Sequence, residues 1–169
     1  MKGTLHEEDG RFVLRFERRF AHPAEKVWRA LTDPAELRHW FPQVVEADLR
    51  PGGKMRFSPR EGESYDAWDG EVTEYDPPRV FAFSWGSDLL RWELRADDEG
   101  CVLEFTDTFG ELGKAARDGA GWHVCLEALV ARLDGGEPPA AGRWREVHPG
   151  YVSRLGPEAA TIGPPGAVS

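Results

Sequence analysis

The alternation of apolar and polar residues changes its period several times along the chain. Residues 11–20 alternate with a period of two, as a half-buried strand does, and the residues after them carry apolar side chains at helical spacing. Proline is tolerated at the first position of a helix because its missing N–H would have no partner there. Pro23 and Pro34 therefore predict two short helices that follow a strand, with Thr32 or Asp33 as the cap of the second.

Beyond these helices the chain returns to a period of two. The alternating segments are separated by short turns rich in proline, glycine and aspartate, at residues 51–53, 76–78 and 98–100. Turns this short join strands that run in opposite directions, whereas parallel strands need a long crossover connection. This part of the sequence therefore predicts one curled antiparallel sheet.

A long amphipathic helix follows the predicted sheet. Between residues 118 and 134 the apolar positions follow one another at i, i+4, i+7, i+8 and i+11, and the pattern ends at two glycines. The stripe consists of Trp122, Leu126, Leu129, Val130 and Leu133. A helix of this kind buries its apolar stripe, and the concave face of the curled sheet is the surface that can receive it.

Five motifs in this order resemble the START-related SRPBCC superfamily, and within it the family of the heat-shock protein 90 ATPase activator. They are HPAEKVW at 22–28, DPAELRHWF at 33–41, DLRPGG at 48–53, DPPRVFAFSW at 76–85 and the Gly-Trp pair at 121–122. The resemblance implies an α+β helix-grip fold. In that fold a curled antiparallel sheet wraps around a long C-terminal helix, with two short helices after the first strand.

The resemblance also implies how the chain is divided and where a ligand would lie. Residues 11–135 form the expected domain, and residues 136–169 form an extension that is expected to be partly helical and then extended. The family fold leaves a cavity between the sheet and the final helix. The residues expected to line it are Trp40, Phe57, Trp68, Phe83, Trp85, Trp92, Phe105, Asp107, Trp122 and Leu126.

These interior residues have two interpretations. Strand alternation places most of them on the concave face, and with seven tryptophans in the chain that face is strongly aromatic. The rings can simply fill the core. Alternatively, some of them line a pocket for an apolar or aromatic small molecule, because such pockets are mostly apolar with few polar anchors.

Asp107 breaks the apolar pattern of its strand face. A carboxylate that points inward must be paired, hydrogen-bonded or protonated. His123 on the long helix and the ring N–H groups of tryptophans are candidate partners. The alternative is that Asp107 lies near the strand end, where water reaches it, and that His123 forms a surface pair with Glu127.

Composition and charge narrow the classes of partner. Thirty acidic and twenty-one basic residues give a net charge of −9, which disfavours binding to nucleic acid and to anionic membrane surfaces. No apolar run approaches a membrane span and no signal peptide is evident, so a cytoplasmic protein is expected. Cys101 and Cys125 are expected to be buried thiols. The histidines lack metal-ligand spacing, so neither a metal nor a cofactor is expected.

Three functions are consistent with this sequence. The first is a binding protein for a hydrophobic or aromatic small molecule. The second is a cyclase- or aromatase-type enzyme, which would require Asp107, with His123 or Tyr65, to face a cavity. The third is a chaperone-associated interaction domain. The catalytic residues of any enzyme remain unidentified at this level, and a homodimer is compatible with the sequence.

Overall fold

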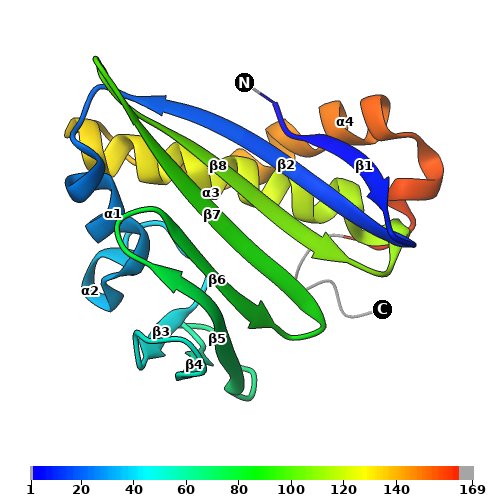
Figure 1. The fold of residues 1–169 in the computed structure, drawn as a ribbon. Helices are drawn as coiled ribbons and strands as arrows, with labels where there is room; N and C mark the ends of the chain where they lie inside the picture. The colour runs from blue at the N-terminus through cyan, green and yellow to red at the C-terminus, as the bar shows by residue number, and fades with distance from the viewer. Residues whose placement is uncertain (1, 164–169) are drawn as a thin grey trace.

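The computed structural model of the protein describes residues 2–163, and Figure 1 shows its fold. Within this range eight strands form one sheet: β1 (Thr4–Glu8), β2 (Arg11–Phe20), β3 (Val44–Ala47), β4 (Lys54–Ser58), β5 (Trp68–Asp76), β6 (Val80–Trp85), β7 (Asp88–Asp97) and β8 (Gly100–Phe109). The helical elements are α1 (Ala24–Thr32), α2 (Pro34–Leu37), η1 (Leu112–Lys114), α3 (Ala115–Asp134), α4 (Arg143–Leu155) and η2 (Pro157–Ala160).

The sheet is antiparallel throughout and open, with the strand order β1-β2-β8-β7-β6-β5-β4-β3. Apart from the β2–β8 pairing, neighbours in the sheet are neighbours in sequence, as the short turns predicted. The α+β helix-grip fold is therefore confirmed. The strand β1 was not predicted, and because of it the two short helices follow the second strand. Four of its five residues are exposed, so no alternating apolar pattern marks it.

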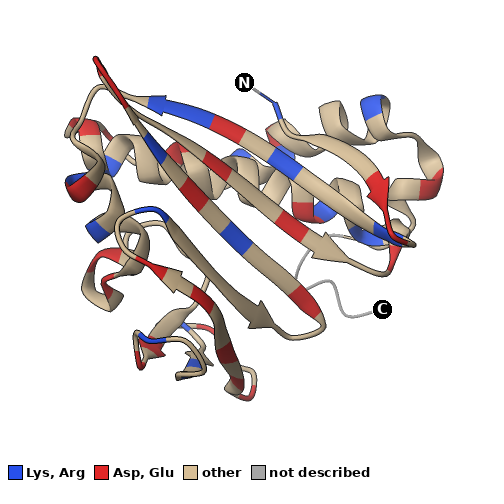
Figure 2. Cartoon of the chain, viewed as in Figure 1, with Lys and Arg blue, Asp and Glu red and all other residues tan. Residues whose placement is uncertain are grey.

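The two faces of the sheet differ in chemistry. Figure 2 shows acidic and basic positions interspersed along β2 and β7, and acidic positions along β8 between them. On this outer face Arg15 of β2 bonds Glu104 of β8 at 2.9 Å, and Arg91 of β7 bonds Glu93 of the same strand at 2.8 Å. The residues between these charges point to the other face and are buried. This face is the concave interior of the grip.

Helix α3 crosses the concave face and closes the interior (Figure 1). Four residues of the predicted stripe, Trp122, Leu126, Leu129 and Leu133, are buried. The indole N–H of Trp122 donates to Oδ2 of Asp107 on β8 at 2.9 Å, which ties the helix to the sheet. The helix ends at Gly135, whose φ of +73° is readily adopted by glycine.

The two short helices cover one end of the sheet and are locked to each other. The carboxylate of Asp33 accepts from the N–H of Ala35 at 3.0 Å and caps α2, as predicted. The indole N–H of Trp40, in the segment after α2, donates to the carbonyl of Ala30 in α1 at 2.8 Å. This bond brings the ring of Trp40 into the interior beside Trp92, with ring centroids 5.6 Å apart.

Helix α4 packs on α3 and on the N-terminal segment. Tyr151 of α4 is 1% exposed, and its hydroxyl accepts from the N–H of Gly3 at 2.9 Å. Gly119 of α3 lies against the same ring, where a Cβ would come within 2.9 Å of it. The sequence also predicted that the extension ends in an extended segment. Part of that segment, residues 164–169, lies outside the described residues.

None of the helices within residues 2–163 combines the length and the apolar composition that crossing a membrane requires.

Replacing Trp122 with alanine should lower the free energy of unfolding by about 3–5 kcal/mol, because it removes a buried indole and leaves a cavity under the sheet. Trp122→Phe retains an aromatic ring but not the N–H, so its loss should be smaller. Chemical denaturation measures both values. A loss below about 1 kcal/mol for the alanine variant would contradict the tight packing of this helix face.

Tyr151→Phe should lower the free energy of unfolding by about 1–2 kcal/mol, because it leaves the buried N–H of Gly3 without its acceptor. Tyr75→Phe is the matched control: Tyr75 is a partly buried ring on β5 that packs against Trp28. Equal stability losses in the two variants would show that the hydroxyl of Tyr151 does not hold α4 and the N-terminus together.

Candidate functional site

A cleft lies at the end of the grip where β6 turns into β7 and α3 begins. It consists of two pockets that share Trp85 and Gln43, the latter from the loop after α2. We call these two pockets together the Trp85 cleft. The site is therefore built from the sheet, the long helix and a loop.

The first pocket has a volume of about 390 Å³ and combines an aromatic wall with a polar edge. Its residues are Gln43, Tyr65, Trp68, Trp85, Gly86, Ser87, Asp88 and Lys114. Tyr65 is 38% exposed and packs against Trp68 with ring centroids 5.8 Å apart. The polar edge places the ammonium of Lys114 and the carboxylate of Asp88 close to this aromatic wall.

The second pocket, of about 370 Å³, lies between Trp85 and helix α3. Its residues are Pro42, Gln43, Trp85, Arg117, Asp118, Gly121, Trp122 and Cys125. Gly121 has no side chain, and space is open where its Cβ would lie. Cys125 is partly buried and not fully buried as expected, and burial raises the pKa of its thiol to about 12, so the thiol contributes an uncharged wall to the pocket.

Trp85 is held in place from two sides. Its indole N–H donates to Oε1 of Gln43 at 2.9 Å. Its ring lies 5.2 Å from that of Trp122 and 6.1 Å from that of Trp68, measured between centroids. The ring is therefore held in place in the wall that the two pockets share.

The ten residues predicted to line a cavity come together in the structure. Asp107, Trp40, Phe57, Phe83, Trp92, Phe105, Trp122 and Leu126 are buried, and Trp68 and Trp85 are partly buried. The buried rings pack on one another: Trp92 lies 5.1 Å from Phe83 and 5.6 Å from Phe105 between centroids. Of the ten, Trp68, Trp85 and Trp122 also border the Trp85 cleft. That a ligand contacts these ten residues stays a prediction.

Asp107 points inward, as its strand pattern predicted, and is fully buried. Its partner is the N–H of Trp122 and not His123, which instead lies 2.9 Å from the hydroxyl of Tyr151 and 3.3 Å from the carboxylate of Glu127. The alternative of a water-exposed strand end does not apply. Burial raises the pKa of Asp107 well above its usual range, and the nearby Asp88 raises it further.

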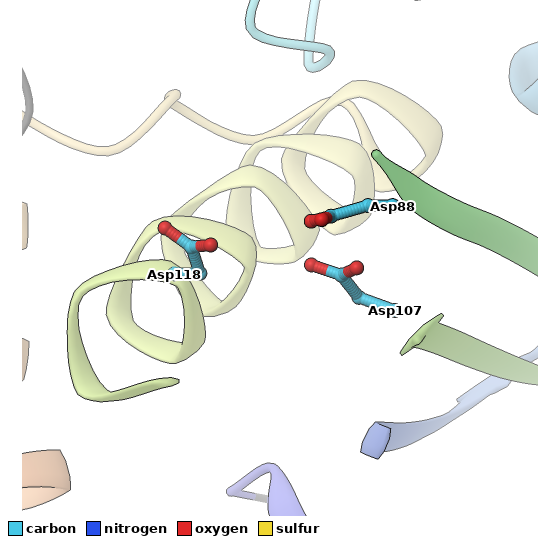
Figure 3. A group of neighbouring side chains, drawn as sticks. All are labelled: Asp88, Asp107 and Asp118. Carbon is cyan, nitrogen blue, oxygen red and sulfur yellow. The ribbon is translucent and has the colours of Figure 1, made fainter. Parts of the chain in front are cut away.

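Asp107 belongs to a cluster of three carboxyl groups that Figure 3 shows. One oxygen of each of Asp88, Asp107 and Asp118 lies within 4.8 Å of the other two. Asp88 begins β7 and Asp118 projects from α3, so the cluster joins sheet and helix. Asp88 is 4% exposed and Asp107 is fully buried, so two of the three carboxyl groups in this cluster are buried.

Two cations balance this cluster. The ammonium of Lys114 lies 2.6 and 2.7 Å from the two oxygens of Asp88 and 3.6 Å from Asp118. Arg117 donates to Asp118 at 2.8 Å. The three carboxyl groups are also the described residues best placed to hold a metal ion. However, Lys114 already supplies positive charge at Asp88, so the donor set fits an ammonium group better than a divalent cation.

Asp88, Lys114 and Gln43 were missed by the sequence analysis. For Asp88 a signal was available. The turn at 98–100 sets Leu90 opposite Asp107, and Asp88 lies two residues before Leu90, on the same face. For Lys114 and Gln43 no comparable signal exists, because each lies in a connection whose position depends on how α3 and α2 dock.

The comparisons with known proteins agree with this architecture. The family described as Activator of Hsp90 ATPase homolog 1-like protein matches residues 21–134. The search of curated proteins found no significant match. Among solved structures, the conserved protein of unknown function EF2215 from Enterococcus faecalis is similar with a TM-score of 0.75 and 22% identity, covering 91% of this chain and 90% of that one.

Two further structures are similar. CalU16 from Micromonospora echinospora has a TM-score of 0.73 and 22% identity, with 91% of this chain and 97% of that chain covered. DynU16, described as a protein in the dynemicin biosynthetic locus, has a TM-score of 0.64 and 27% identity, with 75% of this chain and 48% of that chain covered. The matched segment runs from the turn before α1 to the end of α3, and the chain belongs to the Activator of Hsp90 ATPase homolog 1-like family.

Proposed function

We propose that the protein binds a small planar aromatic molecule in the Trp85 cleft. The observation that carries this proposal is the indole of Trp85, which lines both pockets of the cleft. Flat aromatic molecules stack on such rings, and these contacts contribute about 0.5–1.5 kcal/mol beyond the burial of apolar area. Each pocket lies within the range of about 300–1,000 Å³ that is common for small-molecule sites.

The polar groups of the cleft suggest what the ligand carries. Gln43 and the ammonium of Lys114 lie at the edge of the first pocket, where they can meet a hydroxyl or carbonyl oxygen. The amide oxygen of Gln43 is already bonded to Trp85, which leaves its NH₂ group to donate. A planar ring system with one or two oxygen substituents fits this combination of walls and donors.

The proposed site lies at the mouth of the grip. The interior behind it is occupied by Trp92, Phe83 and Phe105 in mutual contact. A ligand in the cleft leaves these contacts intact, whereas a ligand beneath α3 would have to break them. The similarity to DynU16 supports a small-molecule role only in the general sense that its described locus is biosynthetic. The free thiols Cys101 and Cys125 suit a reducing compartment, and we place this role in the cytoplasm.

Isothermal titration calorimetry of the purified protein with 2-naphthol tests the proposal. The wild-type protein should bind this two-ring phenol at one site, and Trp85→Ala should weaken binding by about fivefold to tenfold, the equivalent of one lost stacking contact. Tyr75→Ala is the matched control, since it removes a partly buried ring that lies outside the residues of both pockets.

Two results would contradict the proposal. One is the absence of a binding signal for the wild-type protein with 2-naphthol and with a larger planar phenol. The other is equal weakening by Trp85→Ala and Tyr75→Ala, which would show that the effect comes from general loss of structure and not from the cleft.

A further inference from the structure

Close to Asp88, which lines the first pocket, lies a buried carboxyl group that has nowhere to place a negative charge. Asp107 is fully buried, and only its Oδ2 has a hydrogen-bond donor, the N–H of Trp122. Its Oδ1 is buried and has no hydrogen-bond partner among the described residues. A carboxylate in this position would leave one charged oxygen unsolvated, which is costly, whereas a carboxylic acid can donate a hydrogen bond from that oxygen.

Asp88 is the acceptor that such a proton would meet. It lies in the same cluster of carboxyl oxygens, within 4.8 Å, and Figure 3 shows the two side chains side by side with their carboxyl groups pointing the same way. Lys114 contacts both oxygens of Asp88 at 2.6 and 2.7 Å and places a positive charge beside that carboxyl group. Two buried carboxyl groups this close do not both ionise readily, and one proton shared between them is the favourable state.

Counting the charges gives the same result. The charged groups around Asp107 come from three elements and are Asp88, Lys114, Arg117 and Asp118. Its cross-strand neighbours Leu14 and Leu90 are apolar and add no charge. The two cations are balanced by the carboxylates of Asp88 and Asp118. A neutral Asp107 therefore leaves the cluster without net charge, and an ionised Asp107 would not.

We propose that Asp88 and Asp107 share one proton at neutral pH and make the first pocket an acid–base site for planar enols and their ketones. This inference rests on the proposed binding function and names the chemistry of its ligand. Asp88 and Lys114 border the pocket, so Asp88 is the catalytic residue that meets the ligand. Asp107 acts through Asp88 as a positioning residue that stores the proton.

The proton balance of the proposed step is complete within the pair. The pair gives its proton to the enol carbon, and the electron pair of the C=C bond forms the new C–H bond. The O–H bond of the enol breaks, its electrons form the C=O bond, and its proton returns to Asp88. The pair ends with one proton, as it began. The ammonium of Lys114 stabilises the negative charge that develops on the oxygen during the transfer.

The enol of phenylpyruvate is a suitable probe, because it is planar and loses its ultraviolet absorbance when it converts to the ketone. The wild-type protein should accelerate this conversion above the buffer rate, and Asp88→Asn and Asp107→Asn should each lose at least about tenfold of the acceleration. Glu104→Gln is the matched control. It removes one carboxylate from the same strand as Asp107, on the charged outer face, and should leave the rate unchanged.

The pH profile separates proton storage from a structural role. The wild-type rate should fall as pH rises through the pKa of the shared proton, and this fall should be absent in Asp107→Asn. Infrared spectroscopy of the protein without ligand adds a second readout, because a protonated carboxyl group has its own C=O band. This band should be present at pH 7 in the wild-type protein and missing in Asp107→Asn.

The outcomes distinguish this inference from the binding proposal. Binding of 2-naphthol without acceleration of ketonisation would overturn the acid–base site and leave the binding function standing. Acceleration that Asp107→Asn does not reduce, or absence of the infrared band at pH 7, would overturn it as well. Failure of both binding and acceleration would overturn both proposals. If Asp107→Asn does not fold, the infrared band and the pH dependence of the rate, both measured on the wild-type protein, still test the proposal.

Thermal unfolding tests the shared proton in another way. Because the pKa of Asp107 is raised on folding, the folded chain keeps a proton that the unfolded chain releases above the ordinary pKa of aspartate, about 4. This group therefore lowers stability progressively as pH rises from 4 towards the folded pKa. Asp107→Asn lacks this titration, so its melting temperature relative to wild type should rise between pH 4 and pH 7.

The same measurement on Glu104→Gln should show the opposite trend. The hydrogen bond from Arg15 lowers the pKa of Glu104, so this carboxylate stabilises the fold above its unfolded pKa, and the stabilisation is lost as pH falls. Its removal should therefore cost more at pH 7 than at pH 4. Parallel trends for the two variants would contradict the assignment of the proton to Asp107.

Discussion

The hydrogen bond between Trp122 and Asp107 is the contact on which the rest of the molecule depends. It joins the middle of helix α3 to the inner face of β8 at a point where the surroundings are apolar rings. The N–H of Trp122 is the hydrogen-bond donor that reaches this buried carboxyl group among the described residues, so the contact fixes both the rotation of the helix and its position along the sheet. Once the helix is fixed, its first turn and the preceding residue Lys114 bring Lys114, Arg117 and Asp118 to the end of the grip.

The aromatic interior determines where a ligand can bind. In this chain the space between sheet and helix is filled by rings that contact one another edge to face, with Trp92 near the centre of the group. Such packing is dense and resists displacement. The open volume lies instead at the edge of the cluster, in the two pockets that Trp85 lines. The fold thus provides a rigid aromatic interior that supports a site at its mouth, with a carboxyl pair behind that site.

Much of the fold could be predicted from the sequence because its signals are local. The turns at 51–53, 76–78 and 98–100 and the apolar stripe of α3 each depend on a few adjacent residues. The inward direction of Asp107 followed from alternation alone. By contrast, β1 has mostly exposed residues and pairs at the sheet edge, where burial imposes no pattern. Whether the aromatic residues fill the interior or surround a cavity depends on how their volumes fit together, and a list of apolar positions does not contain that information.

The candidate site shows the same contrast between features that adjacent residues determine and features that depend on tertiary packing. Asp88 and Asp107 are 19 residues apart, and only the register of β7 on β8 makes them neighbours. Lys114 reaches Asp88 because η1 begins directly after the sheet and turns back towards it. Gln43 reaches Trp85 across 42 positions of sequence. The register of the β7–β8 hairpin could have been inferred from its turn, whereas the contacts of Lys114 and Gln43 follow from tertiary docking and have no signal in the sequence.

A crystal structure of the protein with 2-naphthol bound would test the central claim most directly, because it shows where the ligand lies relative to the aromatic interior. The account predicts electron density for the ligand stacked on one face of Trp85, with Trp92 and Phe105 in unchanged contact. Density for the ligand between the sheet and α3, with these rings displaced, would contradict it.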